Sequence, residues 1–300
     1  MEERLSFYDE IQRNKRKSVF LIIGIFVFFV LLGYIISLAT DPSYFFIIMI
    51  ISIIFSLSYI LISYYNSDKI AIASVRAKKA SRTEHSKFFN AAENMALASG
   101  LPTPKLYVME SSQINAFASG KDPKNAVICV TTGAMERLSK QELEGVIAHE
   151  MSHIANYDVR FMTLTAILVG LISITAQIFL RSLWFSHGGS ENKKSGAIIL
   201  IVAIVASILA PLLAHLVSLA ISRKREFTAD ATAVKFTRYP PGLADALKKI
   251  KHEHSSDEEK KKYPQAVAPL FISDPFKKKI QGAFSTHPPI DERIKKLENM

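Results

Sequence analysis

Residues 139–158 read SKQELEGVIAHEMSHIANYD, and this segment carries the clearest structural signal in the chain. Ser139 is followed three positions later by Glu142, a spacing that predicts a helix N-terminus closed by a capping box. Apolar side chains recur behind it at the spacing of one helical face: Leu143, Val146, Ile147 and Ile154. The sequence therefore predicts an amphipathic helix that begins just after Ser139.

His149 and His153 stand four positions apart on this helix, with Glu150 beside the first. Side chains at positions i and i+4 share a helix face, so both imidazoles can reach one metal ion. Glu150 would then lie next to that ion, an arrangement that suits zinc-dependent hydrolysis of an amide bond. The competing interpretation is two partly buried histidines and an ordinary surface glutamate.

Catalytic zinc usually takes three protein ligands and keeps a fourth position for water. Glu226, within SRKREFTAD (222–230), is the best candidate for the third ligand. Asp230 lies one turn further along the same face, where it can accept the free ring N–H of a metal-bound histidine. The alternative is a solvated face on which Glu226 pairs with neighbouring arginines or lysines. Weaker rivals as ligands are His187, His215, His252 and His254.

Four blocks of sequence occur in a recognisable order: NAFASG (115–120), HEMSHIANYD (149–158), SRKREFTAD (222–230), and THPP (286–289) with Arg293 beyond it. Together they resemble the HtpX-like branch of the membrane zinc metalloproteases, relatives of the CAAX prenyl endopeptidases. The resemblance covers most of the chain. Because no expected motif residue is missing, it implies an active protease rather than an inactive homologue.

The resemblance implies a mainly α-helical membrane protein with a cytoplasmic α+β metalloprotease domain of the zincin-like, gluzincin type, containing a small β-sheet. It implies that one Zn²⁺ per chain is bound by His149, His153 and Glu226. Glu150 would be the general base, and Asp230 would orient a ligand.

The resemblance also places Asn115, Ala116 and Phe117 beside the active site. An exposed strand edge there would bind an extended substrate by main-chain hydrogen bonds. Without the resemblance, this block is an ordinary strand followed by a polar turn. His287 and Arg293 become possible oxyanion or substrate contacts, although as isolated residues both are typical of surface groups.

Apolar segments too long for a soluble core predict a membrane protein. Residues 18–39 and 43–63 contain no charge, and each is long enough to cross a hydrocarbon core of roughly 30 Å. A second pair, 161–180 and 196–221, is less uniform because it includes Gln177, Pro211 and His215. These two helices could instead be partly embedded and wall a cavity above the membrane surface.

The predicted organisation follows from these segments. A cytoplasmic N-terminus (1–17) precedes a transmembrane hairpin (18–63), and a second hairpin (161–221) separates two parts of the metalloprotease domain (64–160 and 222–300). Lysines and arginines precede the first span and follow the second, which keeps both flanks in the cytoplasm. We therefore expect a multi-pass protein of the cell (inner) membrane with a cytoplasmic catalytic domain. A cleaved signal peptide is the competing interpretation of the first span.

The net charge of +10 comes from 37 Lys and Arg against 27 Asp and Glu. Since much of the excess lies beside the spans, it fits attraction to anionic inner-leaflet lipids. No basic stripe interleaved with aromatic residues favours nucleic-acid binding. Cys129 is the single cysteine, so the chain can form no internal disulfide, and a buried free thiol is expected.

Shorter elements are predicted between the motifs. A helix over 83–99 should end at Gly100, and strands are expected at 105–110, 114–119 and 126–131. A further helix is predicted over 241–251, and Pro288 and Pro289 should open a last one.

The functional prediction is a membrane-bound zinc endopeptidase that hydrolyses peptide bonds of misfolded or damaged membrane proteins in quality control. The first alternative is a non-catalytic membrane scaffold clamped by zinc, although structural zinc normally takes four protein ligands, often including cysteine. A CAAX-type protease acting on prenylated peptides is the second. A small-solute transporter is the third, but the chain lacks paired intramembrane charges and detectable repeats.

Overall fold

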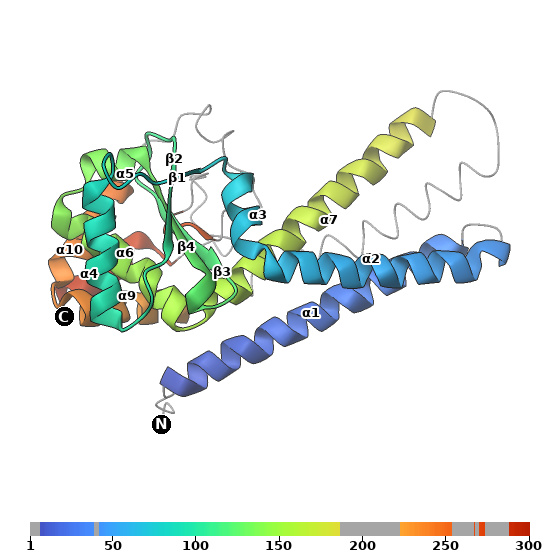
Figure 1. The fold of residues 1–300 in the computed structure, drawn as a ribbon, viewed down its shortest axis with the longest axis horizontal. Coiled ribbons are helices and arrows are strands. Elements are labelled where there is room, and N and C mark those ends of the chain that lie inside the picture. The colour runs from blue at the N-terminus through green and yellow to red at the C-terminus, as the bar shows by residue number, and fades with distance from the viewer. Residues whose placement is uncertain (1–6, 39–41, 187–222, 254–266, 268–269, 274–287) are drawn as a thin grey trace.

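The computed structural model describes residues 7–38, 42–186, 223–253, 267, 270–273 and 288–300. Three features singled out in the sequence lie outside them: the apolar segment 196–221, His287, and the rival ligands His187, His215 and His254. Figure 1 shows the sheet and several helices gathered at one end of the molecule, with α1, α2 and α7 extending away from it.

The first two predicted spans form an antiparallel helix pair. Helix α1 (Phe7–Leu38) and helix α2 (Phe45–Tyr65) are joined through the 3-10 turn η1 (Pro42–Tyr44) and pack along each other. Large apolar side chains of both helices remain exposed, as expected of surfaces that face lipid: Phe20 is 72% exposed and Phe46 is 77% exposed. Among the described residues, 11–34 and 42–65 are long and apolar enough to cross a membrane.

The predicted HExxH helix is α6 (Lys140–Ala155), and α7 (Asp158–Ser186) follows it after a bend of 86°. Tyr157, at the bend, adopts a left-handed conformation with φ 59°, which ends α6 and redirects the chain. Counting this bent pair as one span would give a third membrane crossing. The predicted apolar segment 161–180 is helical within α7, while its place as a full span stays a prediction.

Four strands form one mixed sheet in the order β1-β2-β4-β3. Strand β2 (Lys105–Met109) runs parallel to β4 (Ala126–Thr131), whereas β1 (Lys78–Lys79) and β3 (Ala116–Gly120) pair antiparallel to their neighbours. The three predicted strands are present, with β3 displaced by two residues at its start and one at its end. Strand β3 is thus an outer strand of the sheet.

Helices cover the sheet and build the main core. Helix α4 (Ser86–Ser99) ends at Gly100, as predicted, but starts three residues later than the sequence indicated. Helix α10 (Pro240–Lys251) packs against α6, and α12 (Ile290–Glu298) packs against α10. The remaining helical elements are α3 (Ser67–Ser74), η2 (Pro123–Asn125), α5 (Thr132–Arg137) and α9 (Arg223–Thr237).

Gly145 permits the close approach of α6 and α10. A Cβ atom at this position would lie 2.6 Å from the backbone nitrogen of Leu243, too close for any side chain. Fully buried apolar residues from α4, β4, α6 and α10 meet around this contact, and Phe88, Ile128, Ile147 and Leu247 are all inaccessible to solvent. The position of α6 within the molecule is therefore fixed along most of its length.

The buried thiol predicted from the sequence is confirmed. Cys129 is fully buried in β4, and this burial raises the pKa of its thiol far above the usual range. Since the thiolate is the reactive form, we expect native protein at pH 8 to resist maleimide, whereas the denatured chain should be labelled once. Mass spectrometry of both samples is the measurement, and rapid labelling of the native protein would contradict the burial.

Candidate metal centre

The capping box at the start of α6 is formed as predicted. The Glu142 N–H donates to Ser139 Oγ at 3.3 Å, and the Ser139 N–H donates to Glu142 Oε2 at 2.6 Å. Lys249 of α10 donates to the same Oε2 at 2.6 Å, which ties the helix start to its neighbour. The helix register is thereby set ten residues before His149, and both histidines lie on a buried face.

Helix α9 packs against α6 and brings Glu226 to the two histidines. The two Nε2 atoms of His149 and His153 lie 3.2 Å apart. Glu226 Oε2 lies 3.6 Å from His149 Nε2, and Glu226 Oε1 lies 3.7 Å from His153 Nε2. One ligand atom from each residue lies within 4.8 Å of the others, and all three side chains are buried. The alternative, in which Glu226 lies on a solvated face of its helix, is therefore wrong.

Each imidazole is anchored on its outer side by a carboxylate. His149 Nδ1 lies 2.9 Å from Asp230 Oδ1, and His153 Nδ1 lies 3.1 Å from Asp158 Oδ2. A carboxylate only accepts, so the proton of each neutral ring belongs on Nδ1. In the neutral rings, both Nε2 atoms are then acceptors, 3.2 Å apart, with no hydrogen atom between them. Two acceptors this close repel unless a proton or a metal ion is shared between them.

The spacing fits a tetrahedral metal ion. Zinc bonds of about 2.0–2.2 Å to nitrogen and oxygen place neighbouring ligands roughly 3.3–3.6 Å apart in a tetrahedron. The separations of 3.2, 3.6 and 3.7 Å in the protein bracket that range. Two imidazoles and a carboxylate are also a common donor set for catalytic zinc. The residues present therefore fit the ion that the sequence predicts.

Electrostatics favour a positive charge at this position. Burial and the nearby Arg293 both oppose a charged imidazole, but hydrogen bonds to Asp230 and Glu226 outweigh them and raise the pKa of His149 to about 9. The acidic groups around the ring thus stabilise a cation next to it, whether that cation is a proton or a metal ion.

Glu150 follows His149 on α6 and is almost completely buried, with 1% of its surface exposed. Burial raises the pKa of its carboxyl group, an effect that His149 and His153 oppose and that a hydrogen bond from the Ala118 backbone reduces. The competing interpretation of Glu150 as an ordinary surface residue is therefore wrong. A buried carboxyl group with a raised pKa beside a metal site is suited to accept a proton.

Arg293 of α12 lies inside the site rather than at the surface, with only 1% of its area exposed. Its guanidinium donates from Nε and NH2 to the two oxygens of Asp230 at 2.8 and 2.7 Å, and NH1 lies 3.4 Å from Glu226 Oε2. Burial opposes its charge, but the two carboxylates outweigh it and raise the pKa of Arg293. The interpretation of Arg293 as a surface group is wrong.

Sequence reasoning missed two residues of the site. Asp158, the first residue of α7, is part of the HEMSHIANYD motif, but no role was predicted for it. Its position five residues after His153 was the signal that could have shown its contact with that ring. Asn14 of α1 donates to Asp158 Oδ1 at 2.7 Å and to the Asn156 carbonyl at 3.0 Å. No sequence signal links Asn14 to residues more than 140 positions away.

The β3 edge was expected to be exposed, but the chain itself covers it, and its part in substrate binding stays a prediction. The Ile272 N–H donates to the Ala116 carbonyl at 2.9 Å, and Asn115 Nδ2 donates to the Ser273 carbonyl at 2.9 Å. The Phe117 and Phe271 rings meet edge to face, with centroids 5.0 Å apart. Because 270–272 is apolar, laying it on β3 buries its side chains and satisfies its backbone.

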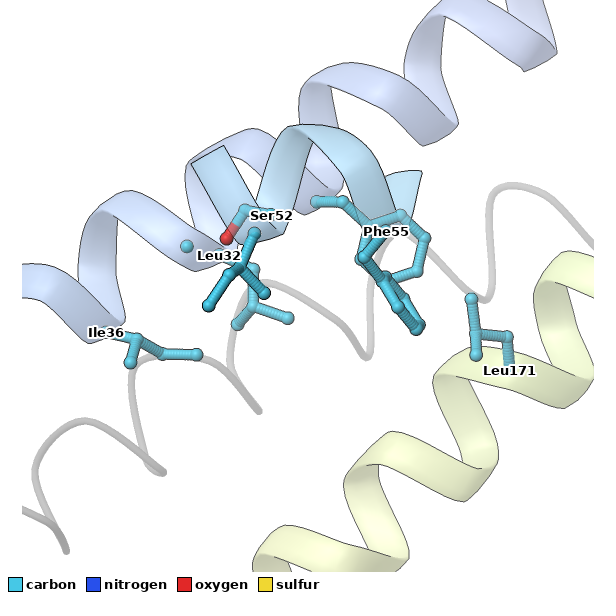
Figure 2. Close-up of a pocket in the computed structure, with 8 residues that line it drawn as sticks. Leu32, Ile36, Ser52, Phe55 and Leu171 are labelled. Atoms are coloured by element: carbon cyan, nitrogen blue, oxygen red, sulfur yellow. The ribbon is translucent and has the colours of Figure 1, made fainter. Parts of the chain in front are cut away.

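An apolar cavity of about 220 Å³ lies among α1, α2 and α7, away from the metal site. Figure 2 shows Leu32 and Ile36 of α1, Ser52 and Phe55 of α2, and Leu171 of α7 around it. None of its lining residues is a titratable group or a candidate ligand.

Comparison with known proteins agrees with this geometry. Residues 83–300 match the model of peptidase family M48. The chain is 47% identical to a protein named "Protease HtpX homolog" from Caldanaerobacter subterraneus over 251 residues, covering 82% of this chain and 83% of that protein. It is 42% identical to the one from Dictyoglomus thermophilum (98% and 95% covered) and 39% identical to one from Listeria monocytogenes (98% and 99%).

Among solved structures, the crystal structure of S. mikatae Ste24p matches at a TM-score of 0.46 and 19% identity, covering 95% of this chain and 65% of that one. The family match spans most of the chain, and the HtpX relatives align from end to end or nearly so. The protein therefore belongs to peptidase family M48 and is a membrane metalloprotease.

Proposed function

We propose that this protein is a zinc-dependent endopeptidase that cleaves misfolded or damaged membrane proteins at the cytoplasmic face of the cell membrane. The observation that carries the proposal is the pair of imidazole Nε2 atoms that face each other at 3.2 Å while carboxylates hold both Nδ1 protons. Such a pair favours a shared cation, and the buried carboxylate of Glu226 next to it offers a third ligand for a metal ion.

Zinc is favoured over other divalent ions by the donor set. Two nitrogens and one carboxylate suit zinc, whereas magnesium and calcium prefer oxygen ligands alone. With three protein ligands, a fourth position stays open for water, which distinguishes a catalytic from a structural site. When bound, the zinc ion would polarise the scissile carbonyl and lower the pKa of the attacking water.

Glu150 is the proposed general base. Its carboxyl group would take a proton from the attacking water and pass it to the leaving amine. The raised pKa that follows from burial brings the group closer to the working pH, which makes both transfers more efficient. The Ala118 N–H, in β3, holds the carboxyl group beside the outer strand where a peptide would lie.

Asp230 and Arg293 are proposed to hold the ligand set. Asp230 accepts a hydrogen bond from His149 Nδ1, and Arg293 fixes Asp230 by donating two hydrogen bonds to it. Arg293 NH1 also lies 3.3 Å from the Ile272 carbonyl, next to the β3 edge. A direct contact of Arg293 with the substrate stays a prediction, as does that of His287, which lies outside the described residues.

Asn115, Ala116 and Phe117 remain the proposed substrate contacts. A peptide that pairs with β3 would have to replace Phe271 and Ile272, which occupy that edge. Binding through backbone atoms selects an extended and therefore unfolded segment, with little regard to its side chains. That preference agrees with a protease for damaged proteins.

The cytoplasmic orientation is supported by cations at the junction between the sheet domain and the membrane helices. Lys15 Nζ lies 4.4 Å from the centre of the Tyr157 ring, and Lys121 Nζ lies 4.5 Å from that of Tyr65. Cationic and aromatic side chains together are typical of the interfacial layer, and an excess of lysine and arginine favours the cytoplasmic side.

We expect one zinc ion per chain. His149→Ala, His153→Ala and Glu226→Ala should each abolish tight binding, because each removes one of the three ligands that converge at the site. Elemental analysis and competition with a chromophoric chelator are the measurements. Glu144→Gln, which alters an acid elsewhere on α6, is the matched control and should bind normally. Unchanged affinity in Glu226→Ala would contradict the ligand assignment.

Glu150→Gln should retain zinc and lose cleavage by about 10²–10⁴-fold, because the amide keeps the shape of the side chain but cannot accept the proton. Cleavage of an unfolded membrane-protein substrate by detergent-purified chains measures the effect, again with Glu144→Gln as the control. Full activity in Glu150→Gln would remove Glu150 as the base.

A peptide hydroxamate inhibitor that binds along β3 should displace the Ile272 N–H from the Ala116 carbonyl, which would then accept a hydrogen bond from the inhibitor. Hydrogen exchange of the Ile272 amide should therefore be slow in the uninhibited protein and at least about tenfold faster with the inhibitor. Exchange mass spectrometry of the peptide that contains 270–273 is the measurement. Continued protection in the saturated complex would show that peptides bind elsewhere.

A further inference from the structure

Asn14 is the one buried residue in a strongly basic turn of α1. The surrounding Arg13, Lys15 and Arg16 are exposed, whereas Asn14 is only 5% exposed. It lies one helical turn before the apolar stretch that begins at Ser18, where α1 approaches the membrane. A polar amide buried at such a place needs hydrogen-bond partners, because burial without them is costly.

Its partners are the two ends of the bend between α6 and α7. Asn14 Nδ2 donates to the Asn156 carbonyl at 3.0 Å and to Asp158 Oδ1 at 2.7 Å, so one amide group bridges both. Asn156 follows the last residue of α6, and Asp158 is the first residue of α7. Asn14 therefore fixes the geometry at which the 86° bend begins.

Asp158 transmits this contact to the metal site. Its Oδ1 accepts from Asn14, and its Oδ2 lies 3.1 Å from His153 Nδ1, so both carboxylate oxygens are engaged. All three side chains are at most 5% exposed, which excludes water as a ready substitute for either contact. If Asn14 moved, the Asp158 carboxylate could rotate, and the His153 ring that it holds could rotate with it.

The amide is also the right kind of donor for this task. A lysine or arginine at the position would neutralise Asp158, whereas an amide holds the carboxylate and leaves its negative charge available to His153. That charge makes the ring a stronger metal ligand. Two basic groups among the described residues act on Asp158 without a close contact: Arg225, whose Nε is 3.8 Å from Oδ1, and Lys17 of α1, which interacts with the carboxylate electrostatically.

The two histidines thus differ in what supports them. Asp230, which anchors His149, is held by Arg293 from within the sheet domain. Asp158, which anchors His153, is held by Asn14 from a helix that enters the membrane. We propose that Asn14 is a positioning residue through which α1 sets the orientation of His153 and so the metal affinity of the site. This inference rests on the metal centre proposed above.

Zinc affinity of the full-length, detergent-purified chain tests the inference. Asn14→Leu keeps nearly the same shape without a donor, and Asn14→Ala also removes volume. We expect both to weaken zinc binding by about tenfold, within the range found when partners of metal ligands are removed. Arg16→Ala, on the exposed side of the same turn, should leave the affinity unchanged. A packing defect alone would affect Asn14→Ala and spare Asn14→Leu, which would overturn the inference.

A double-mutant cycle separates a relay through Asp158 from a general loss of stability. Asn14→Leu should have almost no further effect on zinc affinity when Asp158→Ala is present, but its full effect when Asp230→Ala is present. Equal effects in both backgrounds, or affinities of the single variants within twofold of the parent, would overturn the inference while leaving the metal centre intact. Zinc binding that survives His149→Ala would instead overturn the metal centre and this inference together.

Discussion

The convergence of two imidazole nitrogens, 3.2 Å apart, and one buried carboxylate on the same point is the constraint on which the metal centre depends. Each ring is turned inward because a carboxylate holds its outer nitrogen, and neither ring can rotate away without breaking a buried hydrogen bond. The surrounding helices must be fixed accurately for such a site to persist. The capping box of α6 and the backbone contact at Gly145 supply that rigidity.

The charges around the rings lead to the same conclusion. Four carboxylates are buried near the site, those of Glu150, Asp158, Glu226 and Asp230, against the guanidinium of Arg293, which is fully buried, and that of Arg225, which lies 3.8 Å from Asp158. Buried negative charges without compensation are costly. Arg293 serves Asp230 and Glu226, which leaves an excess of negative charge around the His149 and His153 rings. A divalent cation between them would balance it.

The sequence predicted those parts of the structure that depend on local spacing. The α6 capping box, the apolar face behind it, and the i, i+4 pairing of Glu226 with Asp230 are all properties of one helix, so periodicity was sufficient to find them. Gly100 likewise ended α4 at the predicted residue because a left-handed C-cap is a local feature. The meeting of Glu226 with the histidines was inferred from a family resemblance as well as from spacing.

Features that depend on contacts between distant segments were not predictable from local patterns. Asn14 is an unremarkable amide in a basic turn until the 86° bend after α6 brings Asp158 to it. The closure of the β3 edge by Phe271 and Ile272 was missed for the same reason, since an apolar segment gives no indication of which strand it will cover. As an isolated residue, Arg293 is typical of a surface group, because its amphipathic helix shows nothing of the acids it meets; only the family resemblance placed it near the site.

The place of the bend also connects the chemistry with the membrane. Tyr157 lies between Asn156 and Asp158, and its ring meets Lys15 of α1 at 4.4 Å and Arg160 at 5.2 Å. The segment that anchors His153 is therefore the same one that carries cationic and aromatic contacts of the interfacial kind. On the proposed membrane placement, the metal centre lies next to the headgroup layer. The proposed peptide-binding strand β3 packs against both α6 and α7, so it lies at the same junction.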